Sequence, residues 1–183
     1  MSDRSKLEAL VKDLVERHRA AQQGDPSLHD TSGVRRGDIF VARPDPDDPE
    51  AMRRYVLVVR VVPSRNYVSV LLLDNLPSFA DDHDLILQPG ESGLGFESVV
   101  HANVRHPLWF TQLGDRRGAV TEEELLDLLP RIAKGAVPAE HAHRTGLPLR
   151  SLEDPRRDHK REENRELMEI AAGCIERLIE GGD

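Results

Sequence analysis

The chain has 183 residues, a length typical of one domain with terminal extensions. Charged residues make up 32% and hydrophobic residues 38%, so the chain is polar for a globular protein but apolar enough to bury a core. The net charge of -8 argues against broad binding to duplex nucleic acid, and the single cysteine, Cys174, excludes an internal disulfide and a multi-thiolate metal site.

The distribution of apolar residues also limits where the protein is found. No apolar run approaches the roughly 20 residues that a membrane-spanning helix needs. The first residues, MSDRSKLEALVKDL, lack the apolar region and the small-residue cleavage site of a signal peptide. We therefore expect a cytoplasmic protein without a membrane partner.

The first predicted element is a helix over residues 5–22. Ser5 and Glu8 have the spacing of a capping box. Apolar residues recur with helical spacing, and Gly24-Asp25-Pro26 ends the pattern. The apolar face of this helix consists of Leu7, Leu10, Val11, Leu14 and Val15.

The middle of the chain has the pattern of short antiparallel strands. Residues 55–62 are strongly β-branched, and the turn at Pro63–Asn66 joins them to a second arm. The segment 44–52 holds three prolines and four acidic residues, which is typical of a loop. Strands at this spacing indicate a small barrel or sandwich rather than βαβ units. The predicted strands cover residues 38–43, 55–62, 67–73, 85–87, 98–104 and 108–113.

Helices are predicted again in the last third of the chain. Thr121 and Glu124 form a second capping box, which opens a helix over 122–134. Residues 153–166 are almost entirely charged, which is typical of a solvated helix face or a linker. Residues 167–179 carry a 3.6-residue apolar period and predict an amphipathic helix.

Between Gly37 and Lys134, six pieces of sequence follow one another in an order that is similar to the PemK/MazF-like toxin family. The order and spacing of the pieces carry this resemblance. The pieces are Gly37-Asp38-Ile39, the acidic loop 44–52, Arg54 leading into Tyr55–Val59, Val68–Leu73, Gly93-Leu94 with Ser98-Val99-Val100, and Leu113-Gly114 with Gly118–Thr121 and Glu124-Leu125.

The resemblance implies a fold, an activity and partners. The fold is mostly β: a small SH3-like antiparallel β-barrel over 37–134, flanked by an N-terminal helix in 1–24 and by a C-terminal extension, 135–183, with a charged linker and an amphipathic helix. The activity is that of a toxin–antitoxin endoribonuclease, which cleaves single-stranded RNA by attack of a ribose 2′-hydroxyl without a metal or other cofactor. The implied partners are a cognate antitoxin and a second copy in a homodimer.

The resemblance also implies the site residues. Such a reaction needs a cation to stabilise charge on a pentavalent phosphorane and groups that move protons. Arg54 falls on the family's catalytic arginine, and Ser78 is the hydroxyl nearest to its Thr or Ser position. Arg53, beside Arg54, is a candidate phosphate ligand. Arg116 and Arg117 are placed either to contact RNA or to close a hairpin.

Two features keep a second function open. Tyr55 stands where the family has proline, and Asp81, Asp82 and Asp84 would repel an RNA backbone at short range. His101 is a candidate acid or base near neutral pH, although a lone histidine is more often structural. The alternative is a catalytically degenerate barrel that acts as a protein- or nucleic-acid-binding regulatory module.

Overall fold

The computed structural model describes residues 33–44 and 52–180, and the chain divides into the units 1–33 and 34–183. The predicted helix at 5–22 and most of the loop 44–52 lie outside the described residues. The sheet and helices lie in the second unit. Within the part of the chain that is described, no helix is both long and apolar enough to cross a bilayer.

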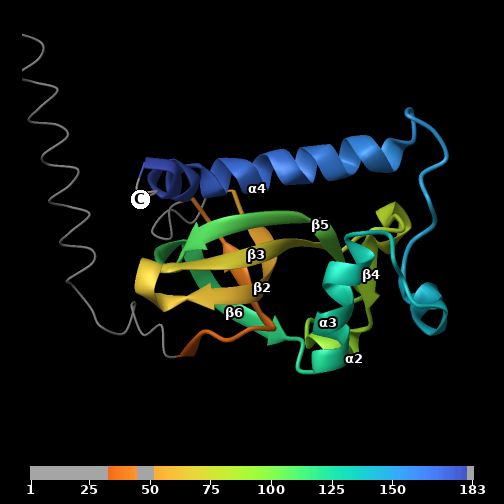
Figure 1. The fold of residues 1–183 in the computed structure, drawn as a ribbon, viewed down its shortest axis with the longest axis horizontal. Helices are drawn as coiled ribbons and strands as arrows, with labels where there is room; N and C mark the ends of the chain where they lie inside the picture. The colour runs from red at the N-terminus through yellow and green to blue at the C-terminus, as the bar shows by residue number, and fades with distance from the viewer. Residues whose placement is uncertain (1–32, 45–51, 181–183) are drawn as a thin grey trace, which may run out of the picture. The chain divides into compact units, whose positions relative to one another are not determined.

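Six strands form one antiparallel sheet in the order β4-β5-β3-β2-β1-β6 (Figure 1). The strands are β1 (Asp38–Ala42), β2 (Arg54–Val62), β3 (Tyr67–Asp74), β4 (Asp84–Leu87), β5 (Ser98–Trp109) and β6 (Leu113–Ala119). The helices are α2 (Pro89–Ser92), α3 (Glu123–Ile132) and α4 (Pro155–Glu180). Short 3-10 turns are η2 (Pro63–Arg65), η3 (Pro77–Phe79), η4 (Phe110–Gln112) and η5 (Ala139–Arg144). The predicted fold class, mostly β with added helices, is confirmed.

The sheet coils, and a short helix joins its two edge strands. Register shifts interrupt the pairing of β3 with β5 and of β1 with β6, which is where antiparallel sheets bend. The edge strand β4 leads into α2, and α2 contacts the other edge strand, β6. At this contact a side chain on Gly118 would place its Cβ at 2.2 Å from the carbonyl oxygen of Ser92. Only glycine fits there. Because α2 bridges the two edge strands, the sheet is barrel-like.

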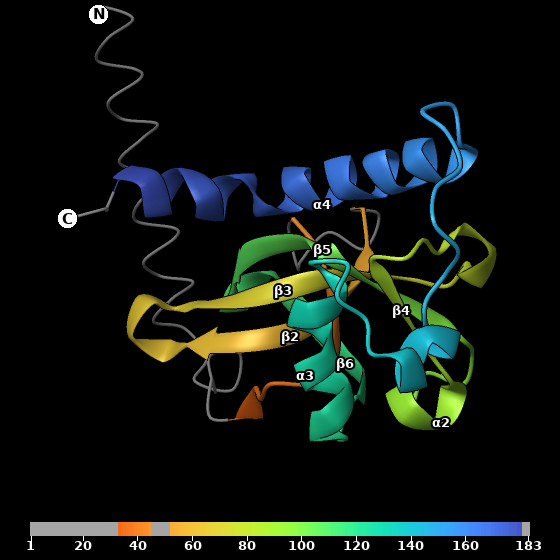
Figure 2. The same cartoon turned by 45° about the vertical axis from the view of Figure 1, so that its right-hand side comes forward.

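Alternation along the strands gives the sheet two apolar faces, and a helix covers each face (Figures 1 and 2). One face packs against α3 through a cluster that includes Leu57 and Leu71. The opposite face packs against α4 through a cluster that includes Val56 and Leu72. Neighbouring residues on a strand point to opposite faces. The face of any other residue on β2 or β3 near these positions can therefore be read from whether it lies an even or an odd number of positions away.

Two segments differ from the sequence prediction. The predicted strand at 108–113 is divided, because β5 continues to Trp109 and β6 begins at Leu113 after the η4 turn. The charged run 153–166 is helical from Pro155 onward. Asp154 caps this helix by accepting a hydrogen bond from the Arg156 amide at 3.1 Å, and proline is well placed in a first helical turn. The Arg156 guanidinium holds the pKa of Asp154 well below its usual range.

Candidate nucleic-acid interface

The predicted catalytic arginine, Arg54, lies at the end of the sheet where β2 begins and β3 ends. Tyr55 pairs with Leu73, so Arg54 and Asp74 occupy the next position on their two strands. Val56 and Leu72, two residues further along, face α4. Arg54 and Asp74 therefore also lie on the α4 side of the sheet.

Four arginines line a pocket of about 230 Å³ at the start of β2. Arg53 precedes β2, Arg54 is its first residue, Arg43 follows β1, and Arg117 comes from β6. Because β1 pairs with both β2 and β6, the sheet itself brings these residues together. Val41 and Tyr55 complete the lining. We name this feature the arginine pocket, and its chemistry suits phosphate oxygens.

The sequence predicted three of the four arginines in this pocket and missed Arg43. Arg43 is anchored by its amide, which donates to the Gln112 carbonyl at 3.0 Å, and its guanidinium lies 3.9 Å from Asp115. Asp115 also accepts a hydrogen bond from Arg117 at 2.8 Å. Arg43 comes just after the first strand, beside the acidic loop, and nothing in its local sequence marks it. Only the pairing of β1 with β6 places it near Arg117.

Arg116 and Ser78 lie apart from the arginine pocket. Arg116 donates from Nε to the buried carboxylate of Asp38 at 2.8 Å, and Asp38 also accepts from the Arg35 amide at 2.8 Å. This contact anchors the start of β1. Ser78 is an exposed residue of η3, and no described contact joins it to Arg54. The roles proposed for Arg116 in RNA binding and for Ser78 in catalysis stay predictions.

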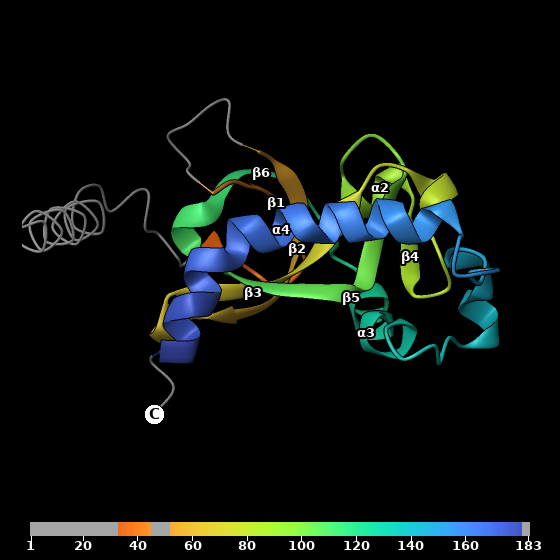
Figure 3. The same ribbon diagram turned by 90° about the horizontal axis from the view of Figure 1, so that it is seen from above.

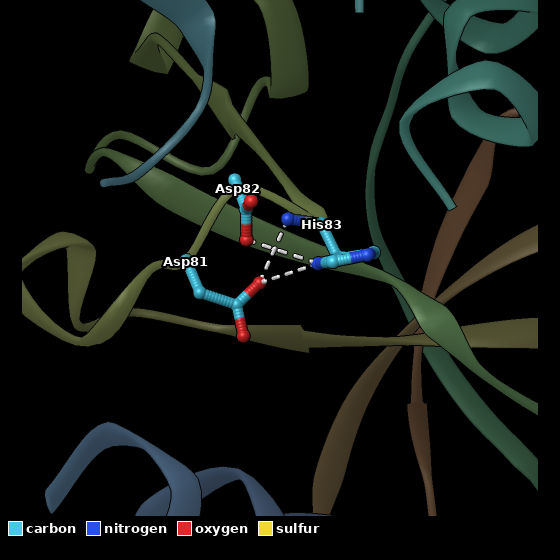
Figure 4. Close-up of side chains that lie close together, drawn as sticks. All are labelled: Asp81, Asp82 and His83. Carbon is cyan, nitrogen blue, oxygen red and sulfur yellow. Dashed lines mark hydrogen bonds and ion pairs between the residues drawn. The ribbon is translucent and has the colours of Figure 1, made fainter. Parts of the chain in front are cut away.

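Side chains of the acidic loop after η3 contact one another and the loop backbone (Figure 4). Asp81 accepts from the His83 amide at 2.8 Å, and Asp82 lies 3.0 Å from the His83 ring. The other oxygen of Asp81 binds the Lys160 ammonium at 2.8 Å. These three loop residues are spaced closely enough to share a cation. However, Lys160 already binds Asp81, so a cation here would have to share this carboxylate with an ammonium group. The same contact offsets part of the negative charge that was expected to repel RNA.

A buried network of charged side chains continues from this loop into the sheet. His101 is 1% exposed, and its Nδ1 lies 2.9 Å from Asp84, which Lys160 also contacts at 2.7 Å. Burial would lower the pKa of His101, but the carboxylates of Asp74, at 3.9 Å, and Asp84, at 2.9 Å, outweigh burial and raise it. Burial would raise the pKa of Asp84, but its hydrogen bond with His101 and the charges of His101 and Lys160 lower it. His101 is therefore a structural residue, and the sequence hypothesis that it acts as a general acid or base is not supported by its position.

Asp74 links this network to the end of the sheet where Arg54 lies. His159 of α4 hydrogen-bonds to Asp74 at 2.5 Å. The centroid of its ring lies 4.4 Å from that of the Phe79 ring. Burial would raise the pKa of Asp74, but the nearby His101 ring and hydrogen bonds with His159 and the Asn75 amide lower it to about 2. The sequence did not single out His159, because it lies within a run of charged residues that resembles a solvated surface.

The depressed pKa of Asp74 predicts an acid-sensitive contribution to stability. A lowered folded-state pKa contributes stability that is complete above the unfolded value of 3.8 and is lost as the pH falls through about 2. Between about pH 5 and pH 2, wild type should lose about 2 kcal/mol more unfolding free energy than Asp74→Asn. Urea denaturation at several pH values measures this difference. Asp158→Asn, at an exposed acid, should follow wild type, and parallel curves for wild type and Asp74→Asn would contradict the assignment.

Comparisons with known proteins were made by sequence and by structure. No protein-family model and no curated protein matches the chain. Among solved structures, it is similar to an endoribonuclease in complex with its cognate antitoxin from Mycobacterial species, at 18% identity and a TM-score of 0.41 over 59% of this chain and 98% of that one. It is also similar to an endoribonuclease from Mycobacterial species, at 19% identity and a TM-score of 0.39 over 56% of this chain and 91% of that one.

A third solved structure of the same kind is Mycobacterium tuberculosis toxin MazF-mt6, at 15% identity and a TM-score of 0.36 over 58% of this chain and 98% of that one. These three similar structures are thus two endoribonucleases and one toxin, all of mycobacteria. At this level of identity and TM-score, the likeness by itself assigns neither an activity nor site residues to the chain.

Proposed function

We propose that this protein is a PemK/MazF-like endoribonuclease of the toxin–antitoxin type, which cleaves single-stranded RNA. The observation that carries the proposal is the arginine pocket. Arg53, Arg54 and Arg117, three arginines that the sequence offers as candidate RNA ligands, line one pocket together with Arg43. The chain has a net charge of -8, but this pocket is locally rich in positive charge. A concentration of arginines of this kind suits the binding of a polyanion.

The proposed reaction is a transesterification within the RNA. The ribose 2′-oxygen forms a bond to the adjacent phosphorus and loses its proton to a base, while the bond to the 5′-oxygen breaks and that oxygen takes up a proton. The products are a 2′,3′-cyclic phosphate and a 5′-hydroxyl. Arg54 would stabilise the charge that develops on the phosphorane, and its neighbours in the pocket would hold the flanking phosphates. Atoms balance without a metal or a cofactor.

Arg54→Ala should lower the rate of RNA cleavage by about 100-fold, because removing one preorganised donor to a transition-state oxyanion typically has this effect. The assay follows a labelled single-stranded RNA in the presence of a chelator, with thermal unfolding recorded in parallel. Arg65→Ala is the matched control, because Arg65 is an exposed arginine in η2, at the opposite end of β2. Cleavage by Arg54→Ala at the wild-type rate would overturn the assignment.

The second candidate function is a catalytically degenerate barrel that binds protein or nucleic acid. One observation favours it: Arg54 is ion-paired with Glu163 of α4, at 3.0 Å from Nε. Under this alternative, induced expression would neither arrest bacterial growth nor fragment total RNA. Under the leading proposal, both effects occur and disappear in Arg54→Ala. A cognate antitoxin partner, the homodimer and a cytoplasmic location stay predictions.

A further inference from the structure

The guanidinium of Arg54 is engaged on both of its edges. Nη1 donates to the carbonyl of Arg53 at 2.8 Å. On the other edge, Nε lies 3.0 Å from Glu163 and Nη2 lies 3.3 Å from it, while Nη2 also contacts Glu166. Two carboxylates thus hold the edge of the guanidinium that a phosphate would bind bidentately. RNA cannot occupy this position while both carboxylates remain there.

Both carboxylates belong to one flank of α4. His159, Glu163 and Glu166 are spaced by four and three residues, so they share one side of the helix. His159 binds Asp74 on the neighbouring strand and contacts the Phe79 ring in η3. The same side of the helix therefore covers both the arginine and the turn that holds Ser78. Figure 3 shows α4 crossing over this end of the sheet.

The part of α4 that carries this flank is attached by polar contacts. Between Pro155 and Glu166 no apolar residue is present, and its described contacts with the sheet and the β3–β4 loop are hydrogen bonds, ion pairs and one ring contact. From Leu167 onward the helix is anchored by buried apolar residues. Separation of the first part from the sheet therefore leaves the apolar anchor in place. The anchoring residues are Leu167, Ile170, Ala171 and Cys174.

We propose that Glu163 and Glu166 act as an internal competitor for the RNA phosphate, so that the protein folds with its candidate site closed by its own helix. This inference rests on the proposed function of Arg54. Opening requires Arg54 to exchange two carboxylates for phosphate oxygens, as the polar part of α4 moves away. A closed state that predominates lowers the apparent affinity for RNA in proportion to the open fraction.

The double variant Glu163→Gln/Glu166→Gln tests this inference, because glutamine keeps the shape and removes the charge. The probe is a labelled 2′-O-methyl oligoribonucleotide, which lacks the attacking hydroxyl and so reports binding alone. We expect its Kd to fall ~10-fold relative to wild type. Adding Arg54→Ala to the double variant should abolish the gain. Glu162→Gln/Glu169→Gln is the matched control, because it removes the same charge from exposed positions of the same helix.

The outcomes separate this inference from the proposed function. A Kd equal to that of wild type in the folded double variant would overturn the inference, even if RNA cleavage remained dependent on Arg54. The opposite result, a gain in binding without cleavage of unmodified RNA by any variant, would support the competitor and reject the endoribonuclease. An equal gain in the matched control would reduce the effect to net charge and overturn the inference. If the double variant does not fold, each single variant should show a gain of ~3-fold.

Discussion

Replacing Asp84 by alanine is expected to lower the free energy of unfolding by about 3–5 kcal/mol, because removing one partner from a buried charged network leaves the others uncompensated. Asp84 is fully buried. One of its oxygens lies 2.9 Å from His101 and 2.7 Å from Lys160, and the other accepts from the Asp81 amide at 2.8 Å. Alanine has no side-chain oxygen and can make none of these contacts.

Urea denaturation at neutral pH measures this loss. Asp158→Ala is the control, since Asp158 is an exposed acid whose ion pair with Arg161 on the surface of α4 should contribute less than about 1 kcal/mol. Asp84→Asn should fall between the two, because its amide oxygen still accepts hydrogen bonds but carries no charge. A loss below about 1 kcal/mol for Asp84→Ala would show that the network is not coupled to folding.

The elements of the fold were predictable where a single local pattern dominates. β2 and β3 combine β-branched apolar runs with a proline-containing turn, and both appear within one residue of the predicted bounds. The helix α3, Glu123–Ile132, follows its apolar period, but the predicted capping box does not form, because the N-cap is Glu122 and makes no side-chain cap hydrogen bond. The continuation of β5 to Trp109 was not predictable, because Pro107 normally argues against a strand interior. Its pairing with Ser69 on β3 decides that segment.

The candidate site was predictable only as far as it depends on residues near one another in the chain. Arg54 begins β2 and Arg53 directly precedes it, and their place follows from the local pattern. Contacts with α4 were not predictable, because Glu163 and Glu166 lie more than a hundred positions from Arg54 within a run that looks solvated. A charged run indicates exposure only when no charged surface faces it. Here the sheet presents Arg54, and the loop after η3 presents Asp81, so the run becomes a set of partners.

Leu167→Ala should lower the free energy of unfolding by about 2–5 kcal/mol, because it removes a fully buried side chain and leaves a cavity between α4 and the sheet. Met168→Ala, at the next position but half exposed, should change stability by less than about 0.5 kcal/mol. Both are measured by urea denaturation under identical conditions. A loss below about 1 kcal/mol for Leu167→Ala would contradict the packing of α4 on this face of the sheet.

The same pair of variants bears on how α4 is built. If Leu167 anchors the apolar part of α4, the contacts between Arg54 and Glu163 depend on that anchor, because they lie one helical turn before it. Amide exchange in Leu167→Ala should therefore quicken along all of α4, including the turn that holds Glu163. In Glu163→Gln/Glu166→Gln, the faster exchange should be confined to residues before Leu167. Such a difference would show that the apolar half of α4 holds the helix to the sheet, whereas its polar half determines whether Arg54 is available to an anion.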